Sequence, residues 1–435
     1  AQDIMSESIP LTRKFVVRNI AELFSGSAIA QALTALTFLL MARQLGASVY
    51  GTFTSSLVLA SITALVFNLG LDLWLMHSAG KNPAKAAEYM GSIFGLKLFF
   101  SVLWFVLLLL IQPFLDAETF PPAVLFWTAG IVWLDSLFLT ILSGFKAALQ
   151  NRYTLILEPA SDVLWLAGTL VLIFFGMDAL LPYLQLRFGV LLISLLAAGI
   201  LIWRRNQPAF HQNTARLALR ETPPYALSEL LAMTTMRMDL LIVALVLGSA
   251  AAGLYSPALS VVNALFFVPA AIANVMIPVL SRLYREHPVQ ARKTALRQTL
   301  LQLAVGIGMF VVFLAASPLM VRFLGESYDG LAPLLVVLSF VLLLKPLTFA
   351  GAAMLVASGN QQPRLYIQVF AAALSIALDL LAVSYFGLTA VAVVYVVVEA
   401  CTAAGYYALA WLLTRHQPDT PAPGTPSPSQ REVRE

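Results

Sequence analysis

Long apolar runs separated by short polar segments form the pattern of this chain. Twelve such runs can be marked, near residues 16–41, 50–76, 89–112, 122–145, 155–176, 181–203, 223–247, 254–281, 298–321, 331–356, 364–386 and 388–413. Each exceeds the roughly 20 residues that an α-helix needs to cross the apolar core of a bilayer. The alternating pattern of a membrane β-barrel is absent from the sequence. The pattern therefore predicts an all-α polytopic membrane protein with twelve transmembrane helices.

A glycine-containing motif occurs twice, at the junction of the first two runs and again at the junction of runs seven and eight. It reads L-G-x4-G-x-F over 45–53, just after Arg43, and L-G-x4-G-x-Y over 247–255. Gly46 and Gly248 permit a left-handed cap, and Gly51 and Gly253 permit a tight return of the chain. Such glycine pairs are also common in unrelated apolar hairpins. The shared spacing favours a true repeat, and it predicts two six-helix bundles related by a pseudo-two-fold axis.

The repeat and the polar segments divide the chain into four parts. Residues 1–205 are expected to form an N-terminal lobe, 206–222 a cytoplasmic linker, 223–416 a C-terminal lobe and 417–435 a disordered, Pro-rich cytoplasmic tail. If the N-terminus is cytoplasmic, 20 of the 26 basic residues lie inside and only Arg43 and Arg322 lie outside. The positive-inside rule therefore predicts that both termini are cytoplasmic, in the cytoplasmic (inner) membrane of a cell.

Composition agrees with a membrane protein and excludes several kinds of site. Apolar residues make up 60% of the chain and charged residues only 11%, against about 25% charged in soluble domains. The basic pI reflects orientation and contact with anionic lipid, so it gives no reason to expect nucleic acid. One cysteine, Cys401, permits no disulfide within the chain, and the four histidines are too scattered for a zinc or haem site. No cofactor is expected other than a coupling ion.

Several runs contain prolines, which remove a helical hydrogen bond and permit a bend. Pro257, Pro269 and Pro278 all lie in the eighth run, and Pro346 lies in the tenth. Proline is also commoner in membrane helices than in soluble ones. Three prolines in one run nevertheless favour a bent eighth helix that lines a substrate path.

Charged residues within the apolar runs are the best functional evidence in the sequence. A charge at the centre of a bilayer costs about 2.5–3.5 kcal/mol on insertion scales, so each needs a partner or a wet cavity. Many of them are expected to form structural ion pairs. The set is Glu22, Asp72, Lys97, Asp135, Glu158, Asp162, Arg187, Glu229, Arg237, Asp239, Lys345, Asp379 and Glu399.

Two carboxylates, Asp239 and Asp379, are expected at one depth. Each lies sixteen residues beyond the proline that begins its helix, or about 24 Å from the cytoplasmic end, and Val391 falls at about the same level from the other side. Two carboxylates with nearby oxygen atoms could bind Na⁺ or share a proton. The alternative is that Asp239 pairs with a neighbouring Lys or Arg.

Arg237 is the strongest candidate for binding an anionic group. It lies two positions from Asp239, about 200° around the helix, so it faces the cleft between the lobes if Asp239 faces into its own lobe. A guanidinium there suits a phosphate oxygen. Lys345, Lys97 and Arg187 are weaker candidates, and Lys97 could instead pair with Asp135 or Asp162. Glu158 and Asp162, four residues apart, are interpreted as acids paired with Lys97, Lys146 or Arg152, the alternative being a proton relay.

Four segments together resemble the polysaccharide (O-antigen or exopolysaccharide, Wzx-like) flippases of the multidrug/oligosaccharidyl-lipid/polysaccharide exporter superfamily. They are ARQLGASVYGTF (42–53), NLGL (68–71), GFKAALQNR (144–152) and the stretch 239–255. The resemblance spans all twelve runs. It implies a V-shaped transporter of two six-helix bundles, with helices 1, 2, 7 and 8 lining a cationic cleft.

The related lipid II flippases bind Na⁺ in their second lobe, and the resemblance extends residue by residue to that site. Asp239, Asp379 and Val391 match its ligands, whereas Ser375 stands in place of an Asn and Tyr395 in place of a Thr. The two additional helices of those flippases have no counterpart here, and their cavity arginines on helices 1 and 2 are not evident.

The function expected from these observations is translocation of undecaprenyl-pyrophosphate-linked oligosaccharide by alternating access, coupled to Na⁺ or H⁺. The protein would act as a monomer, in contact with membrane lipids and alongside a polysaccharide polymerase and glycosyltransferases. The nearest rival is a drug/cation antiporter of the same superfamily. A glycan polymerase or ligase would need large external loops, which the sequence lacks, and a scaffold would explain neither the interior charges nor the repeat.

Overall fold

All regular structure in the described chain is helical. The computed structural model describes residues 13–82, 85–148 and 150–415, so Glu22 lies in a described helix but without a described side chain, and the predicted tail lies outside the described residues. The helices are α1 (Arg13–Asn68), α2 (Leu71–Lys81), α3 (Ala86–Ile111), α4 (Pro122–Ala147), α5 (Asn151–Phe174), α6 (Leu180–Asn206), α7 (Gln212–Glu221), α8 (Pro223–Leu247), α9 (Ser249–Leu265), α10 (Phe267–Glu286), α11 (Pro288–Leu324), α12 (Leu331–Ala357), α13 (Gln361–Phe386) and α14 (Leu388–Arg415), with short 3₁₀ turns η2 (Gln112–Phe114) and η3 (Glu326–Tyr328).

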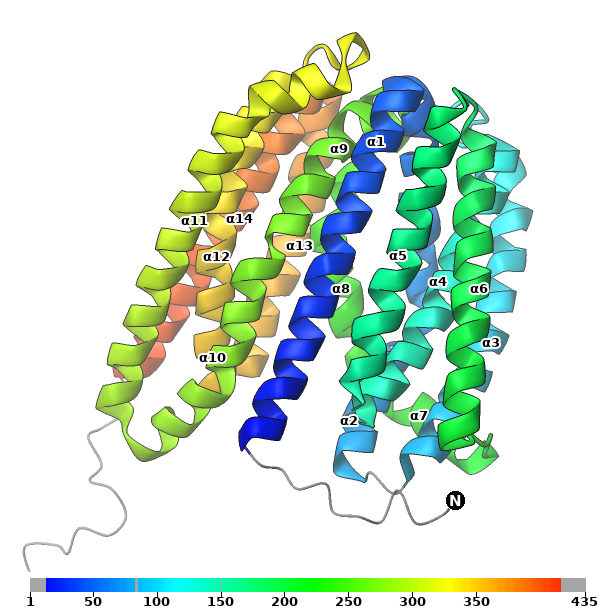
Figure 1. Ribbon diagram of the computed structural model, residues 1–435. Helices are drawn as coiled ribbons and strands as arrows, with labels where there is room; N and C mark the ends of the chain where they lie inside the picture. The colour runs from blue at the N-terminus through cyan, green and yellow to red at the C-terminus, as the bar shows by residue number, and fades with distance from the viewer. Residues whose placement is uncertain (1–12, 83–84, 149, 416–435) are drawn as a thin grey trace, which may run out of the picture.

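The helices gather into two bundles that meet along the middle of the molecule. Figure 1 shows α3, α4, α5 and α6 on one side and α10, α11, α12 and α14 on the other, with α1, α8 and α9 between them. Within the first bundle α1 packs on α4 and α5, and within the second α12 packs on α11 and α14 while α8 packs on α13. The contact between the halves is carried above all by α1 and α9. This arrangement agrees with the expected pair of six-helix bundles.

Helix α1 supplies two membrane crossings because it is bent sharply at Gly46. Its 56 residues would extend about 84 Å if straight, far more than the about 30 Å of a bilayer core. Gly46 has φ 73° and ψ 165°, outside the helical region, so two helices meet there, and Figure 1 shows the chain turning back at the top of the molecule. We call residues 13–45 the first arm of α1 and residues 47–68 its second arm.

The number of membrane-spanning helices is compatible with the twelve expected. In the described residues ten helices are long and apolar enough to cross a membrane, and the bent α8 adds an eleventh. This count treats residues 26–68 of α1 as one helix. Dividing α1 at Gly46 adds the remaining crossing. The second crossing is itself interrupted at Leu69 and Gly70, whose φ values of 53° and 64° separate the second arm from α2.

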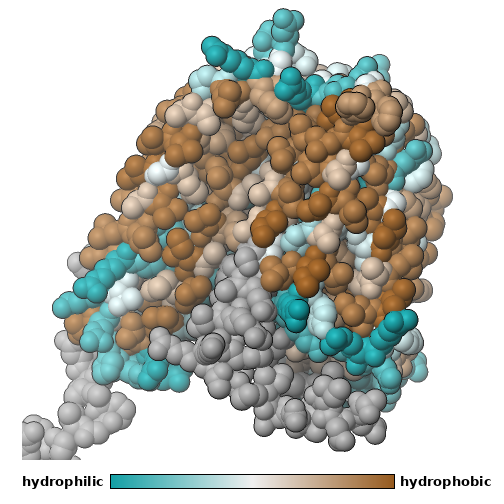
Figure 2. Space-filling view, in the orientation of Figure 1, coloured by the Kyte–Doolittle hydropathy of each residue, from teal (hydrophilic) through white to brown (hydrophobic). Residues whose placement is uncertain are grey.

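The surface of the bundles is apolar over a broad band. In Figure 2 hydrophobic residues cover the middle of the visible face, and hydrophilic residues gather at its upper and lower ends. On α3 the side chains of Leu98, Phe99 and Val102 are exposed, and this helix is long and apolar enough to cross a membrane. Exposed leucine and phenylalanine in such numbers suit contact with lipid tails. The chain is therefore a multi-pass membrane protein.

The eighth crossing is broken where its prolines indicated a bend. The segment divides into α9 and α10 at Phe266, three residues before Pro269. Pro269 has no N–H to donate to the carbonyl of residue 265, so the helix loses a hydrogen bond at this point. By contrast α12 runs without interruption through Pro346. Proline alone therefore permits a break without imposing one.

Candidate functional site

The two glycine motifs form matching hairpins that pack against each other. Gly248 has φ 82° and ψ −177°, nearly the conformation of Gly46. A Cβ atom on Gly51 would lie 1.8 Å from the carbonyl oxygen of Ser249, and one on Gly253 would lie 1.8 Å from that of Ala47. The contacts are reciprocal, as a pseudo-two-fold axis requires, and only glycine allows the backbones to approach this closely.

We call this contact the outer gate, because in the expected orientation Arg43 and Arg322 mark the external side. It comprises 47–56 of the second arm and 249–260 of α9. Tyr328 reinforces it by donating its hydroxyl hydrogen to the carbonyl oxygen of Ala42 at 2.9 Å. Arg43 lies at the rim, with its guanidinium 4.7 Å from the centre of the Phe323 ring. The outer ends of the two bundles are thus in firm contact.

Asp239 is buried in the second bundle and is held by hydrogen bonds rather than by a cation. Its side chain accepts hydrogen bonds from the hydroxyl of Tyr255 at 2.8 Å and from the main-chain N–H of Leu240 at 2.7 Å. Among the described residues it has no basic partner, so the expected alternative of an ion pair is not found there. Tyr255 is the aromatic residue that ends the second copy of the motif, and its role as a donor was not anticipated from the sequence.

Asp379 faces the same region from α13. One of its carboxylate oxygens accepts a hydrogen bond from Ser375 at 3.0 Å, and the other is buried without a partner in the protein. Asp239 and Asp379 lie close enough to repel each other electrostatically. Seven or eight residues separate them from the outer ends of their helices, so both lie about 10–12 Å inward. Counted from the outer helix ends as well, the two carboxylates lie at about the same depth.

Two residues of α14 complete this cluster. Tyr395 lies seven residues from the outer end of its helix, and its buried hydroxyl has no partner. Val391 is fully buried and can offer only its main-chain carbonyl. The oxygen atoms not already engaged are therefore few, and the described residues contain no group of three or more His, Cys, Asp or Glu side chains placed to hold a metal ion. The cluster suits a proton or a weakly bound Na⁺ better than a tightly held divalent ion.

Lys345 is neutralised inside the second bundle. Its ammonium lies 2.9 Å from a carboxylate oxygen of Glu399, and both side chains are buried. The rings of Phe266, Phe349 and Tyr395 surround the ammonium at 5.7–6.0 Å. The pair thus connects the Asp239–Asp379 cluster to the α9–α10 break. The sequence could not reveal Glu399 as the partner, because 54 residues separate it from Lys345.

The basic residues of the first bundle are also neutralised. Lys97 forms an ion pair at 2.5 Å with Asp72, and not with either of the partners expected for it. Arg187 binds Asp162 at 3.0 Å, approaches Asp135 at 3.9 Å, and lies over the ring of Trp165. Lys97 and Arg187, like Lys345, therefore form structural ion pairs instead of presenting a free charge to a substrate.

The two acids of α5 do not share a partner. Asp162 binds Arg187, whereas the nearby Glu158 accepts a hydrogen bond from Ser27 at 3.3 Å. The expected pairing of these acids with Lys97, Lys146 or Arg152 is therefore not the arrangement for Asp162, which uses Arg187 instead.

Arg237 differs from the other three interior cations. It is exposed and forms no ion pair with the described residues. Its nearest electrostatic partner is Asp135 of α4 in the opposite bundle, whose side chain is 42% exposed. Arg237 therefore faces the space between the bundles, opposite in direction to the buried Asp239 on the same helix, as the spacing of the two residues predicted.

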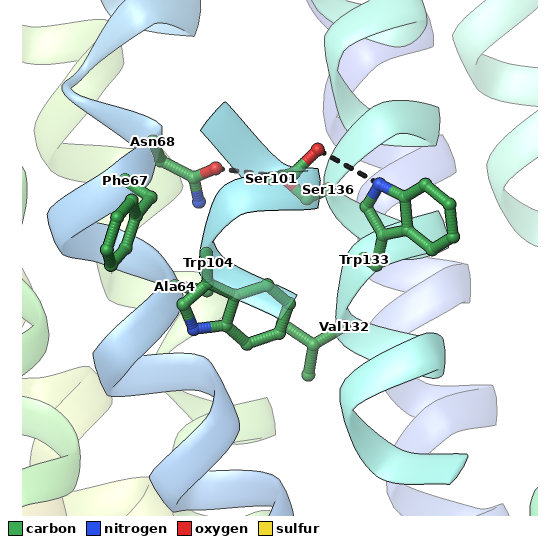
Figure 3. A pocket seen from close by; sticks show the side chains of 8 residues that line it. All are labelled: Ala64, Phe67, Asn68, Ser101, Trp104, Val132, Trp133 and Ser136. Carbon is green, nitrogen blue, oxygen red and sulfur yellow. Dashed lines mark hydrogen bonds between the residues drawn. The ribbon is translucent and has the colours of Figure 1, made fainter. Parts of the chain in front are cut away.

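A shallow pocket lies within the first bundle rather than between the two bundles. Figure 3 shows it between the second arm, α3 and α4. Trp133 donates to Ser101 at 2.9 Å, and Ser136 donates to Asn68 at 3.0 Å. The pocket volume of about 180 Å³ includes space open to the outside, its lining has no charged group, and its polar atoms are largely paired with each other. It is a gap in packing rather than a place for an anionic substrate.

Comparison with known proteins agrees with this architecture. A family model described as "Polysaccharide biosynthesis protein" matches residues 16–284. No curated protein sequence was found to match the chain significantly.

Several solved structures share the fold at low sequence identity. The chain resembles a multidrug resistance MATE family transporter of the MOP superfamily in its inward-facing conformation, with a TM-score of 0.71, 14% identity, and coverage of 89% of this chain and 96% of that one. The outward-facing conformation of such a transporter gives 0.63, at 14% identity and 92% and 97% coverage. The eukaryotic MATE transporter AtDTX14 gives 0.65, at 15% identity and 93% and 97% coverage.

Proposed function

Because this chain belongs to the polysaccharide biosynthesis protein family, within the MOP exporter superfamily, we propose that it translocates undecaprenyl-pyrophosphate-linked oligosaccharides across the cytoplasmic membrane. Transport proceeds by alternating access between the two bundles and involves no chemical step. The lipid tail stays in the bilayer while the pyrophosphate and its glycan pass through the cleft. The product would serve the synthesis of a surface polysaccharide.

One observation carries the proposal: Arg237 is the single interior cation in the described residues that has no ion-pair partner and faces the cleft. A guanidinium donates two parallel hydrogen bonds to phosphate oxygens, so it fits a pyrophosphate. The neutralised Lys97, Arg187 and Lys345 are less suited to this task. Their charges are already compensated, and separating a buried pair is costly.

We further propose that the Asp239–Asp379 cluster binds the coupling cation. The buried, unpartnered oxygen of Asp379 and the unpartnered hydroxyl of Tyr395 face a region where two carboxylates repel each other. A proton or Na⁺ relieves that repulsion. Because Tyr255 and Ser375 already donate hydrogen bonds to the carboxylates, few free oxygens remain, which favours H⁺ over Na⁺.

A drug/cation antiporter is the second candidate, and one observation favours it. The acids Asp135 and Glu229 are only partly buried, and both interact electrostatically with residues of the opposite bundle. An acidic cleft attracts organic cations. The two candidates thus differ in whether Arg237 or the carboxylates dominate the cleft.

The experiment uses the full chain in proteoliposomes with a fluorescent undecaprenyl-pyrophosphate oligosaccharide. Transport is compared for wild type, Arg237→Ala, Arg237→Lys and Asp379→Asn, under an imposed Na⁺ gradient or an imposed pH gradient. Loss of one charge-assisted hydrogen-bonding group, about 1.5–3 kcal/mol, predicts a roughly 10- to 100-fold loss of transport in Arg237→Ala. Arg237→Lys should recover part of it, because it keeps the charge without the planar fork. Asp379→Asn should remove the dependence on the gradient.

Each outcome separates the candidates. If wild type moves the lipid-linked glycan and Arg237→Ala does not, the flippase proposal stands. If wild type ignores the glycan but exchanges a cationic dye for protons, the antiporter replaces it. Stimulation by a pH gradient alone supports H⁺, whereas stimulation by a Na⁺ gradient alone contradicts our preference between the two ions.

A further inference from the structure

The outer gate contains hydroxyl groups that are buried and unpaired. The side chains of Tyr50 and Ser55 are 0% exposed and that of Ser256 is 3% exposed. None of the three hydroxyls has a hydrogen-bond partner in the protein. Burying a hydroxyl without a partner costs free energy. The neighbouring Ser56 is also fully buried and unpaired, and four such groups at one contact are unusual, since buried polar side chains are nearly always paired.

These hydroxyls belong to the two surfaces that the gate brings together. Ser55 lies one helical turn after Gly51, and Ser256 lies one turn after Gly253, so each shares the face of its glycine. The Tyr50 hydroxyl lies within reach of the hydroxyls of Ser256 and Ser260 from the other half, without a well-aligned hydrogen bond. Ser260 itself donates to the main-chain oxygen of Ser256 at 2.9 Å. Both bundles therefore contribute to one polar lining.

A permanently closed contact would gain nothing from this lining. Alanine at Ser55 and Ser256, and phenylalanine at Tyr50, would fill nearly the same space without leaving polar groups unpaired. The lining has a use only when the hairpins separate and the hydroxyls meet what lies between them. Hydroxyl groups both donate and accept hydrogen bonds, so they match the hydroxyls of a carbohydrate. They do not match a hydrocarbon tail.

We propose that Tyr50, Ser55 and Ser256 form a carbohydrate-binding wall when the outer gate opens, and that they hydrogen-bond the glycan as it leaves on the external side. The inference rests on the proposed function, because it assigns the glycan part of the same substrate to this surface. It divides recognition between two places. Arg237 holds the pyrophosphate in the cleft, and the gate hydroxyls hold the sugars about 4–12 Å from the outer ends of their helices.

The test compares wild type with three variants, Tyr50→Phe, Ser55→Ala and Ser256→Ala. Each substitution removes one hydroxyl group and little else. Ser339→Ala is the matched control, because Ser339 is also fully buried but donates to Val336 at 2.6 Å within α12. Transport in proteoliposomes is measured for two fluorescent lipids, undecaprenyl pyrophosphate with the oligosaccharide and without any sugar. The readout is the ratio of the two rates.

The ratio separates glycan binding from an effect on gate closure. Removing an unpaired hydroxyl also stabilises the closed gate, but that slows both lipids by the same factor. A lost hydrogen bond to the glycan lowers only the rate for the glycan-bearing lipid. Each variant should therefore lower the ratio by about two- to tenfold, the range for one neutral hydrogen bond, while Ser339→Ala leaves it unchanged.

An unchanged ratio in all three variants would overturn the carbohydrate-binding wall while leaving the flippase proposal intact. If wild type moves neither lipid, the proposed function fails and the wall fails with it. If wild type moves only the glycan-bearing lipid, the free oligosaccharide is titrated calorimetrically into the purified proteins. Binding two- to tenfold weaker in the variants then supports the wall, and equal binding overturns it.

Discussion

At the scale of single residues, three of the four interior cations form ion pairs with carboxylates of another helix. Asp72 with Lys97, Asp162 with Arg187 and Glu399 with Lys345 each place opposite charges on different helices. The sequence identified these residues, because any charge in an apolar run is conspicuous. It could not identify the partners, since pairing depends on which helix faces meet. Neither Asp135 nor Asp162, the two partners considered for Lys97, binds it.

Breaking one of these pairs should destabilise the protein more than removing it whole. Lys345→Ala leaves Glu399 charged and buried, which costs about 3–5 kcal/mol of unfolding free energy, whereas Lys345→Met with Glu399→Leu should cost far less. Thermal unfolding in detergent measures both. Arg282→Ala is the control, because its pair with Glu286 is exposed and contributes less than about 1 kcal/mol. Equal effects of Lys345→Ala and the double variant would contradict a structural ion pair.

The close approach at the outer gate makes a second residue-scale prediction. Gly253→Ala places a methyl group 1.8 Å from the main-chain oxygen of Ala47, and overpacking of this kind costs about 1–3 kcal/mol. The strain acts only while the gate is closed, so the open state should gain population. A cysteine introduced at Ser256, with Cys401→Ser as background, should react faster with an impermeant external maleimide. Gly308→Ala, where a Cβ atom meets nothing within 4 Å, should leave the reaction rate unchanged.

At the scale of helices, the breaks fall only partly where the sequence indicated. The eighth crossing is divided at Phe266, near Pro269, as its three prolines favoured, but α12 stays straight enough to remain one helix through Pro346. Burial does not account for the difference, because Pro269 and Pro346 are both buried. The interruption at Leu69 and Gly70 was seen only as a motif. The interruption allows a close contact with another helix, because a Cβ atom on Gly70 would lie 2.5 Å from the main-chain nitrogen of Ala226 in α8.

The α9–α10 break is expected to act as a hinge. Pro269→Ala restores an N–H donor to residue 265 and lets the two helices join. We expect slower transport at unchanged thermal stability, with a longer distance between spin labels placed near the ends of α9 and α10. Pro278→Ala, within the unbroken part of α10, is the control. A transport rate equal to wild type in Pro269→Ala would show that the break is not used as a hinge.

At the scale of the whole molecule, the number of crossings and the division into two halves follow from hydropathy and the glycine motif. Both are properties of local sequence. The sequence does not predict the distance between the two bundles. That distance depends on the contact between Gly51 and Ser249, which are 198 residues apart along the chain. The candidate site shares this limit: the depths of Asp239 and Asp379 were predicted, but the donors Tyr255 and Ser375 belong to helix faces whose contacts only the fold defines.

Locking that contact should stop transport reversibly. Ala47→Cys and Ser249→Cys, in a Cys401→Ser background, can be joined by a short bis-maleimide with a cleavable spacer. Transport should fall at least tenfold on cross-linking and return on cleavage, because alternating access requires the gate to part. Each single-cysteine variant treated in the same way should keep its rate. Full transport in the cross-linked protein would exclude opening at this place.

The reciprocal packing of Gly51 and Gly253 also indicates how the two halves arose, namely from a homodimer. A patch that contacts its own counterpart about a two-fold axis is isologous, the commonest interface of homodimers. A six-helix chain carrying one copy of the motif could therefore have paired with a second copy of itself through this surface. In such a dimer every substitution at the gate would have acted twice. Once the halves were joined in one chain, each side was free to change alone, and the second copy of the motif now has Ala252 at the position of Tyr50.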